Sequence, residues 1–265
     1  MSSTLKCFRR GINARLWWIA ASVLAAQGMA WAQTDEIQVY DGAIAERHKF
    51  NLMIHNNFTA KGLQEPAFPG AVESNHALVG VAEWAYGVTD WFEQGLYLPL
   101  YSFSPNDGAN YNGFKLRWLF VRPHADDHKF FYGVNFEFSV NRPQWDTRHF
   151  TSEVRPIVGW HLKPIDIIVN PIVDTAYTGG FKSLEFVPAA RVAYNFNSKW
   201  AGAIEEYADY GPLREIYPAH DQSHQIWAVA NHSGKAINIE TGIGFGLTSS
   251  SDKVTLKFMI SRDLN

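Results

Sequence analysis

The stretch that decides the fold is FFYGVNFEFSV, residues 130–140. Every second position is apolar, and the set is Phe130, Tyr132, Val134, Phe136, Phe138 and Val140. The intervening positions are Phe131, Gly133, Asn135, Glu137 and Ser139. Successive side chains of a β-strand point to opposite faces, whereas a helix would mix the two sets. The stretch therefore predicts a strand with one apolar and one mainly polar face.

The same alternation recurs outward along the chain. The clearest further examples are residues 114–121, 153–160, 184–195 and 236–247. Less regular strands are expected at residues 50–58, 78–88, 92–103, 165–174, 200–207, 225–231 and 254–260. The segment LYLPLYS, residues 96–102, is apolar on both faces, so its faces stay unassigned. Pro156 and Pro188 each remove a ladder donor, so both are expected at bulges.

The connections between these strands alternate in length. The short ones are residues 89–90, 163–164, 195–199 and 232–235, and the long ones are 60–75, 104–112, 141–152 and 208–224. Short periplasmic turns opposite longer outer loops are typical of bacterial outer-membrane barrels. We therefore predict an all-β fold, a transmembrane antiparallel β-barrel of the bacterial outer membrane with about 12 strands and both termini in the periplasm.

Aromatic residues near the predicted turns support a membrane location. Trp84, Trp91, Trp160, Phe196 and Trp200 fall at strand ends, where rings form the interfacial girdle of a barrel. Aromatic residues make up 15% of the chain and charged residues only 18%. A soluble lipocalin-like cup is the alternative, but it would leave many large rings exposed to water.

The amino-terminal residues read as a secretory signal. Lys6, Arg9, Arg10 and Arg15 are followed by an apolar run over residues 16–26 and by the small-residue pattern of residues 30–32. We expect a cleaved signal peptide at 1–32, a periplasmic amino-terminal segment or plug at 33–48, and the transmembrane barrel at 49–265. The second segment, with Ile37 and Val39 among several acidic residues, either hangs disordered in the periplasm or folds into the lumen.

Charge and cysteine content exclude several classes of function. Cys7 is the only cysteine and lies in the signal, so the mature chain has no disulfide, thiolate metal site or cysteine nucleophile. Removing the signal leaves 19 basic against 26 acidic residues, a net charge of about −7. A nucleic-acid partner is therefore not expected.

Three stretches give the chain a family resemblance. They are EIQVYDGAIA at residues 36–45, HNNFT at 55–59 and YGVTDWFEQGLYLPLY at 86–101. Through them the chain resembles the outer-membrane proteins described as MetA-pathway of phenol degradation transporters. The resemblance implies a barrel that takes up hydrophobic or aromatic compounds and implies no catalytic residues. Such barrels usually end in an aromatic residue, whereas this chain ends in Asn265.

Charged residues on the polar faces of the strands are the candidate solute-binding groups. The lumen is expected to hold Glu83, Lys115, Arg117, Glu137, Arg155, Asp166, Glu185, Arg191, Glu240 and Lys257, with Glu153 and Asp174 beside them. One interpretation is a charged constriction that selects solutes by their charge. The other is an ion-pair network that fills a narrow barrel, and the sequence does not choose between them.

Two short motifs raise other chemistry. Residues 231–234, Asn-His-Ser-Gly, are the nearest fragment to the histidine and serine of outer-membrane phospholipases, but they lack that spacing and fit a hairpin turn. Residues 124–128, His-Ala-Asp-Asp-His, hold metal-ligand types in a predicted turn. A solvated turn is the simpler interpretation of both, so no catalytic residue, metal or cofactor is expected.

The function expected from the sequence is an outer-membrane channel or transporter for small solutes, with hydrophobic or aromatic compounds implied by the resemblance. A closed barrel with a structural, sensory or lipid-modifying role is the alternative. The expected partners are outer-membrane lipid, a small-molecule solute and the barrel-assembly machinery.

Overall fold

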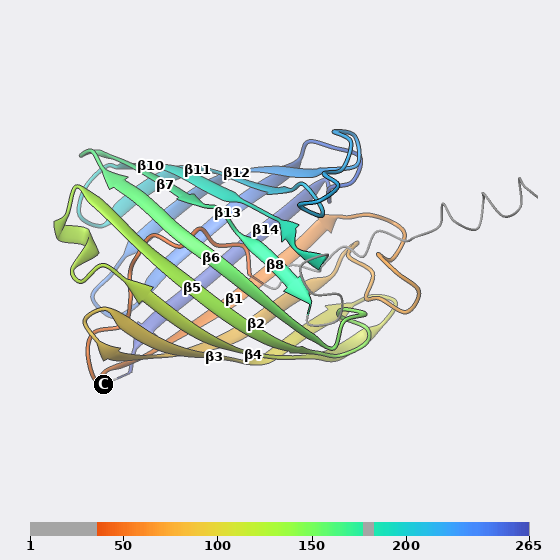
Figure 1. Cartoon of the computed structure of the whole chain (residues 1–265), viewed down its shortest axis with the longest axis horizontal. Coiled ribbons are helices and arrows are strands. Elements are labelled where there is room, and N and C mark those ends of the chain that lie inside the picture. Colours follow the sequence, from red (N-terminus) through yellow and green to blue (C-terminus); the bar gives the residue numbers. More distant parts are fainter. Residues whose placement is uncertain (1–35, 177–182, 265) are drawn as a thin grey trace, which may run out of the picture.

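The strands form one closed antiparallel barrel, shown from the side in Figure 1. The computed structural model describes residues 36–176 and 183–264. The predicted signal peptide at 1–32 lies outside the described residues. Among the residues described, no helix is long and apolar enough to cross a membrane.

Fourteen strand segments and the 3-10 helix η1 follow one another along residues 36–176 and 183–264. They are β1 Phe50–Lys61, β2 Leu78–Thr89, β3 Phe92–Ser104, β4 Gly108–Val121, η1 Ala125–Asp127, β5 Phe130–Asn141, β6 Phe150–His161, β7 Ile165–Asn170, β8 Val173–Ala176, β9 Glu185–Phe186, β10 Ala189–Asn195, β11 Trp200–Asp209, β12 Ser223–Ser233, β13 Asn238–Gly246 and β14 Val254–Asp263.

These segments make the twelve strands that the sequence predicts. Both β7 and β8 pair with β6 in one register, so they are two parts of one strand, and β9 and β10 are likewise two parts of another. Closure comes from β1, which pairs with β14 as well as with β2. Because the ring of described strands closes, their edges pair with one another and are not open to another chain.

The barrel has a turn end and a loop end, which we name by their connections. The turn end carries the short connections at residues 90–91, 162–164, 196–199 and 234–237, and the loop end carries residues 62–77, 142–149 and 210–222. The prediction of a long loop at 104–112 is wrong, because β4 begins at Gly108. Gly108 adopts φ 68 and Ser104 Oγ bonds Asp107, so a three-residue turn replaces the loop.

Burial follows the alternation of the sequence. In β5 the side chains of Phe131, Asn135 and Glu137 are buried, whereas Phe130 and Tyr132 are exposed on the outer wall. The outer wall also exposes large apolar side chains on most other strands, among them Trp84, Leu116, Trp118, Phe150, Val192, Ile204, Ile226, Leu256 and Phe258. A continuous apolar outer surface of this kind suits a lipid surrounding.

Three prolines lie in one row across three neighbouring strands. The register of β6 with β7 and β8 sets Pro156 opposite Pro171, and the register of β7 and β8 with β9 and β10 sets Pro171 opposite Pro188. The expected bulge at Pro156 is wrong, because β6 keeps its register with β5 through that residue. Pro156 has no backbone N–H to donate. The residue opposite it is Pro171, which lies between β7 and β8, and no ladder hydrogen bond is made there. At Pro188 the strand is interrupted.

A bulge in β3 explains why residues 96–102 are apolar on both faces. The pairing of β3 with β4 shifts between Tyr97 and Leu100, so these two side chains both point inward and are fully buried. Leu98, which lies between them, is exposed on the outer wall. A strict two-residue period therefore fails in this part of β3.

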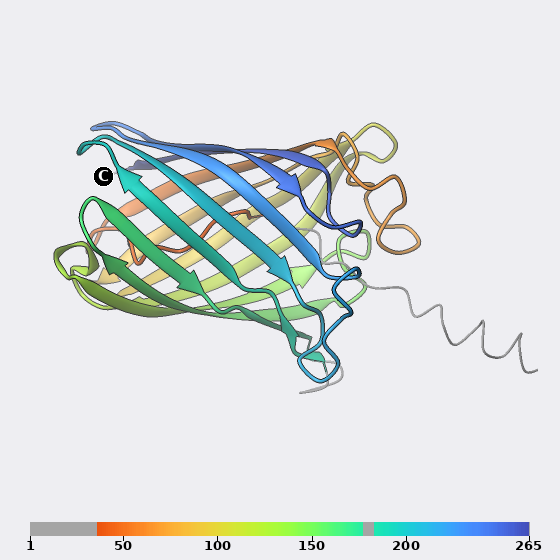
Figure 2. The same ribbon diagram turned by 90° about the horizontal axis from the view of Figure 1, so that it is seen from above.

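Residues 36–49 run inside the ring of strands before β1 begins, as the red-orange trace in Figure 2 shows. We call residues 36–49 the inner segment. Gly42 adopts φ 85 and a Cβ there would lie 2.9 Å from the ring of Phe131. A Cβ at Gly87 of β2 would lie 2.3 Å from the carbonyl oxygen of Glu46. Both glycines are therefore required for the inner segment to lie against the barrel wall.

Candidate functional site

The inner segment packs into the apolar part of the barrel interior towards the turn end. Val39 and Tyr40 join a buried cluster that includes Leu119, Phe131 and Ile157. Ile37 joins a second buried cluster, with Ala193, Ala203, Trp227 and Val229. These contacts come from many strands, so the inner segment fills the interior at this level.

Asn170 of β7 fixes the backbone of the inner segment. The backbone N–H of Tyr40 donates to Asn170 Oδ1 at 2.7 Å, and Asn170 Nδ2 donates to the carbonyl oxygen of Tyr40 at 3.0 Å. Asn170 is fully buried. The side-chain amide thus satisfies both backbone groups of one residue that has no strand partner.

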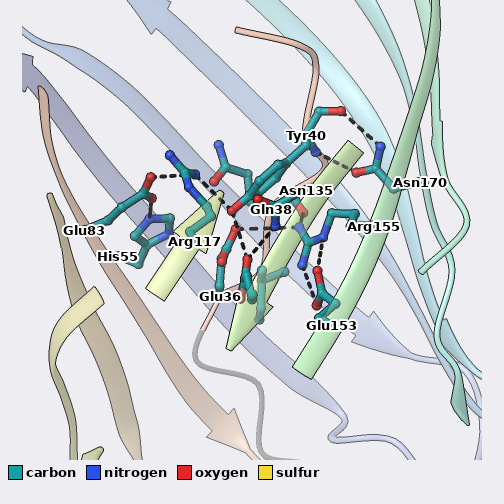
Figure 3. Close-up of polar contacts among 12 residues, drawn as sticks. Glu36, Gln38, Tyr40, His55, Glu83, Arg117, Asn135, Glu153, Arg155 and Asn170 are labelled. Carbon is teal, nitrogen blue, oxygen red and sulfur yellow. Dashed lines mark hydrogen bonds and ion pairs between the residues drawn. The ribbon is translucent and has the colours of Figure 1, made fainter. Parts of the chain in front are cut away.

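The side chain of Tyr40 lies at the centre of a buried polar network (Figure 3). Its hydroxyl is 2.6 Å from the Tyr97 hydroxyl, and it donates to Glu137 Oε1 at 3.3 Å. The Arg117 Nη1 donates to the same hydroxyl at 3.1 Å. The Arg155 guanidinium lies 4.3 Å from the ring centre of Tyr40, within cation–π range.

Arg117 is shared by two buried carboxylates. Its Nη1 lies 2.7 Å from Glu83 Oε1, and its Nη2 donates to Glu93. Glu83 Oε2 is in turn 2.9 Å from His55 Nε2, as Figure 3 shows. Such buried charges are stable only when paired and hydrogen-bonded, and this group meets that condition.

A second buried charge group, together with Asn231, joins five strands on the other side of the interior. Lys257 Nζ of β14 lies 2.6 Å from both Glu205 Oε2 and Glu240 Oε1. Arg191 donates to Glu205 and, at 2.5 Å, to Asn231 Oδ1. Lys257 Nζ also donates to the carbonyl oxygen of Ile37 at 3.1 Å, so this group holds the inner segment as well.

Arg155 of β6 connects the wall to the beginning of the inner segment (Figure 3). It donates twice to Glu153, from Nε at 2.6 Å and from Nη2 at 3.1 Å. Its Nη1 donates to the carbonyl oxygen of Gln38 at 3.0 Å and lies 3.6 Å from Glu36 Oε1. One guanidinium therefore serves two carboxylates and a carbonyl.

An open cavity of about 310 Å³ occupies the loop-end half of the interior. Its floor is formed by Glu36, Ile37 and Gln38 of the inner segment, and its mouth by the loops at residues 63–74, 145–148 and 250–252. Among the described residues the turn-end half is packed and the loop-end half is open, so these residues enclose a cup.

Eight of the ten residues predicted to face the lumen lie in three places. Glu83, Arg117 and Glu137 lie in the network around Tyr40, Arg155 and Lys115 lie next to Glu137 and Glu153, and Arg191, Glu240 and Lys257 form the group on the opposite side. The other two lie apart. Asp166 bonds His161 at 2.7 Å near the turn end, and Glu185 pairs with Arg148 at 3.1 Å near the loop end.

Sequence reasoning missed several interior residues, namely Tyr40, His55, Glu93, Tyr97 and Glu205. Four of them lie on strands whose alternation is less regular, and Tyr97 lies in residues 96–102, whose faces stayed unassigned. The polar positions His55, Asn57 and Thr59, all buried in β1, were the signal that could have shown which face points inward.

The two motifs with possible chemistry are not assembled into sites. The ring of His232 contacts that of Trp200, with 4.5 Å between the ring centres, and Asn231 points to Arg191 and Glu240, so residues 231–233 do not converge. Residues 124–128 form the η1 turn. Within residues 36–176 and 183–264, no group of three or more His, Cys, Asp or Glu could hold a metal ion.

Comparison with solved structures shows the fold. The chain is similar to the COG4313 outer membrane channel from Pseudomonas putida F1, with a TM-score of 0.58 and 12% identity over 86% of this chain and 100% of that one. It is also similar to the KdgM porin in complex with disordered oligogalacturonate, with a TM-score of 0.52 and 6% identity over 81% of this chain and 99% of that one. No family model and no curated protein sequence matches the chain. The chain thus has the fold of outer-membrane barrels, and the resemblance to the phenol-degradation transporter family stays a prediction.

Proposed function

We propose that this chain is an outer-membrane channel for small solutes that enter through the loop end and leave through the turn end when the inner segment moves. The observation that carries the proposal is the cup itself. The barrel wall is closed and complete without the inner segment, and residues 36–49 fill the turn-end interior together with buried side chains of the wall. Removing a segment that is not part of the wall would join the cavity to the periplasm.

The apolar outer wall supports the location in the outer membrane. Trp91, Trp160 and Trp200 are exposed at or next to the turn-end connections, where interfacial rings are expected. With an even number of strands, the amino and carboxyl ends of the barrel lie together at the turn end, which is then the periplasmic side. Export through a cleaved signal and insertion by the barrel-assembly machinery belong to the same proposal.

The cavity lining supports small solutes with a hydrophobic or aromatic part. Val72, Val79, Trp145, Ile172 and Val187 contribute apolar surface to it. Apolar surface of this kind is usual in a small-molecule site, and charged side chains make up much of the remaining lining. We assign the charge groups around Arg117 and Lys257 to holding the interior together, since their side chains are buried and paired.

The test is the conductance of the mature chain in planar bilayers, compared with a variant that lacks residues 33–45. We expect rare openings for the full chain and frequent, larger ones for the variant. Heat-modifiable gel mobility, measured for both, checks that the barrel has folded. A folded variant that stays silent, and that passes no sugar into liposomes, would refute a channel and leave the structural, sensory or lipid-modifying alternative.

A further inference from the structure

Four carboxylates lie side by side across four neighbouring strands of the barrel wall. Glu137 of β5 is in register with Glu153 of β6, Glu153 with Asp174 of β8, and Asp174 with Glu185 of β9. We call these four residues the acidic row. Directly opposed residues on paired strands have Cβ atoms about 5 Å apart, and like charges at such positions destabilise a sheet. The four carboxylates of the acidic row therefore repel one another unless cations lie beside them.

The wall supplies cations for three of the four. Lys115 Nζ lies 3.4 Å from Glu137, Arg155 bonds Glu153, and Arg148 lies 3.1 Å from Glu185. Asp174 lies between two carboxylates, and its Oδ1 is buried with no hydrogen-bond partner among the described residues. The negative charge of the acidic row is thus not fully balanced by cations at Asp174.

An independent observation comes from the inner segment. Glu36 is only 5% exposed, and neither of its carboxylate oxygens has a hydrogen-bond partner in the described part of the chain. Its nearest cation, Arg155 Nη1 at 3.6 Å, is already bonded to Gln38, and the same guanidinium holds Glu153. Glu36 and the four residues of the acidic row all line the open cavity.

We propose that the cavity binds small organic cations, with the ammonium group of an amine held at the corner formed by Glu36, Glu153 and Asp174. The proposal names the solute class of the channel proposed above and rests on that function only for transport, not for binding. An ammonium brings three donors and a positive charge, which suits carboxylate oxygens that lack donors.

The surroundings favour an organic cation over a metal ion or an anion. Calcium and magnesium need about six or more oxygens at short distance, and no such group exists among the residues that the structure describes. Ile172, Val187 and Trp145 line the same cavity and offer apolar contact to a hydrocarbon part. Ten carboxylates and three basic side chains line the cavity, so an anion would be repelled.

The binding test uses three probes with the same ring, namely benzylamine, benzyl alcohol and benzoate, titrated calorimetrically into the purified mature barrel. We expect benzylamine to bind and the other two to bind at least about tenfold more weakly. Asp174→Asn should weaken benzylamine binding about tenfold or more. Glu185→Gln, which keeps the inner segment untouched, should weaken it in the same direction.

The matched control is Asp90→Asn, the same substitution at an exposed residue in a turn-end connection. It should leave benzylamine binding unchanged. Equal binding of the three probes, or equal affinity in Asp174→Asn and Asp90→Asn, would overturn the proposal. Displacement of benzylamine by micromolar calcium would also overturn it, because the site would then be a metal site.

Bilayer conductance separates this proposal from the channel proposal. Binding that depends on Asp174 in a barrel that never conducts supports the amine site and refutes the channel. A conducting barrel that binds the three probes alike supports the channel and refutes the amine site.

Discussion

Lys257 Nζ lies 2.6 Å from Glu205 Oε2, and neither side chain is exposed to solvent. The two residues belong to β14 and β11, which are not neighbours in the sheet. The contact therefore crosses the interior, and Glu240 on the intervening β13 is also 2.6 Å from the same ammonium. One cation holds two buried carboxylates and the carbonyl of Ile37 in place.

Lys257→Met should destabilise the barrel, because it leaves Glu205 and Glu240 without this cation. Removing one partner of a buried ion pair lowers the free energy of unfolding by about 3–5 kcal/mol. The free energy of unfolding, from urea titration of the barrel refolded in liposomes, measures the effect. Lys49→Met is the control, since that side chain is 42% exposed and its pair with Glu46 contributes little. Equal stability of the two variants would show that the buried group is not structural.

Phe136→Arg should hinder insertion of the barrel. Phe136 lies on the apolar face in the middle of β5, and a cation near the bilayer midplane of a barrel wall costs about 2–4 kcal/mol. Phe196→Arg at the turn end should cost about 0–1 kcal/mol, because a cation is tolerated near the interface. Heat-modifiable mobility of the two variants decides the matter. If both fold equally well, the outer wall of β5 does not face lipid.

Asn170→Ala should loosen the inner segment, because the N–H and carbonyl of Tyr40 both lose their partner. An unsatisfied buried backbone group costs about 1–3 kcal/mol. Cys7, the only cysteine of the sequence, lies in the predicted signal, so after cleavage Val39→Cys would provide a single thiol whose labelling by a membrane-impermeant maleimide reports exposure. We expect labelling at least about fivefold faster when Asn170→Ala is added. Asn106→Ala, in the exposed β3–β4 turn, should not change the labelling rate. A labelling rate unchanged by Asn170→Ala would show that Asn170 does not hold the inner segment in place.

Opening should increase with pH because of Glu36. Burial raises the pKa of this carboxyl from 4.5 to about 7; Glu137 and Glu83 act in the same direction, and Arg155 and His55 oppose it. The Glu36 carboxyl therefore binds its proton more tightly when the inner segment lies inside the barrel than when the segment has moved out. The stabilisation that protonated Glu36 gives to the inner segment inside the barrel is complete below about pH 4.5 and is lost as the pH rises through about 7.

Single-channel recordings at about pH 5 and about pH 8 measure this effect. The open probability should be higher at the upper pH, and Glu36→Gln should remove the difference. Glu46→Gln is the control within the same segment, since its side chain is 71% exposed. A pH response that persists in Glu36→Gln would assign the effect to another group.

The mature chain should begin at Gln33, after the small residues Ala30 and Ala32. Intact-mass measurement of membrane-extracted protein checks the site. A mass that includes Met1 would contradict cleavage and would add 32 residues before the inner segment.

The sequence predicted the barrel because lipid imposes a strict pattern on the outer wall. Residues 130–140 alternate with Phe131 as the one apolar exception on the inward face, and the structure forms β5 over Phe130–Asn141. It failed where a backbone irregularity breaks the period, as at Leu98 in β3, and where a turn is closed by local bonds, as at Gly108. Such features depend on tertiary register, which the period alone does not contain.

The site was less predictable for a different reason. Glu83, Arg117 and Glu137 could be expected in the interior from the polar face of each strand. Their common partner Tyr40 could not, because residues 36–49 have no period of their own and fit a disordered tail equally well. The proline row also escaped prediction, since it exists only once the register of three strands is known.

The inner segment imposes an order of events on the folding of the chain. Ile37 is near the amino terminus of the mature chain and its binding partner Lys257 is on the last strand, 220 residues later. The residues that reach the periplasm first are thus among the last to be fixed, since the interior is incomplete until β14 has paired with β1. A nascent barrel without β14 would leave the thiol of Val39→Cys open to labelling, and completion of the chain would protect it.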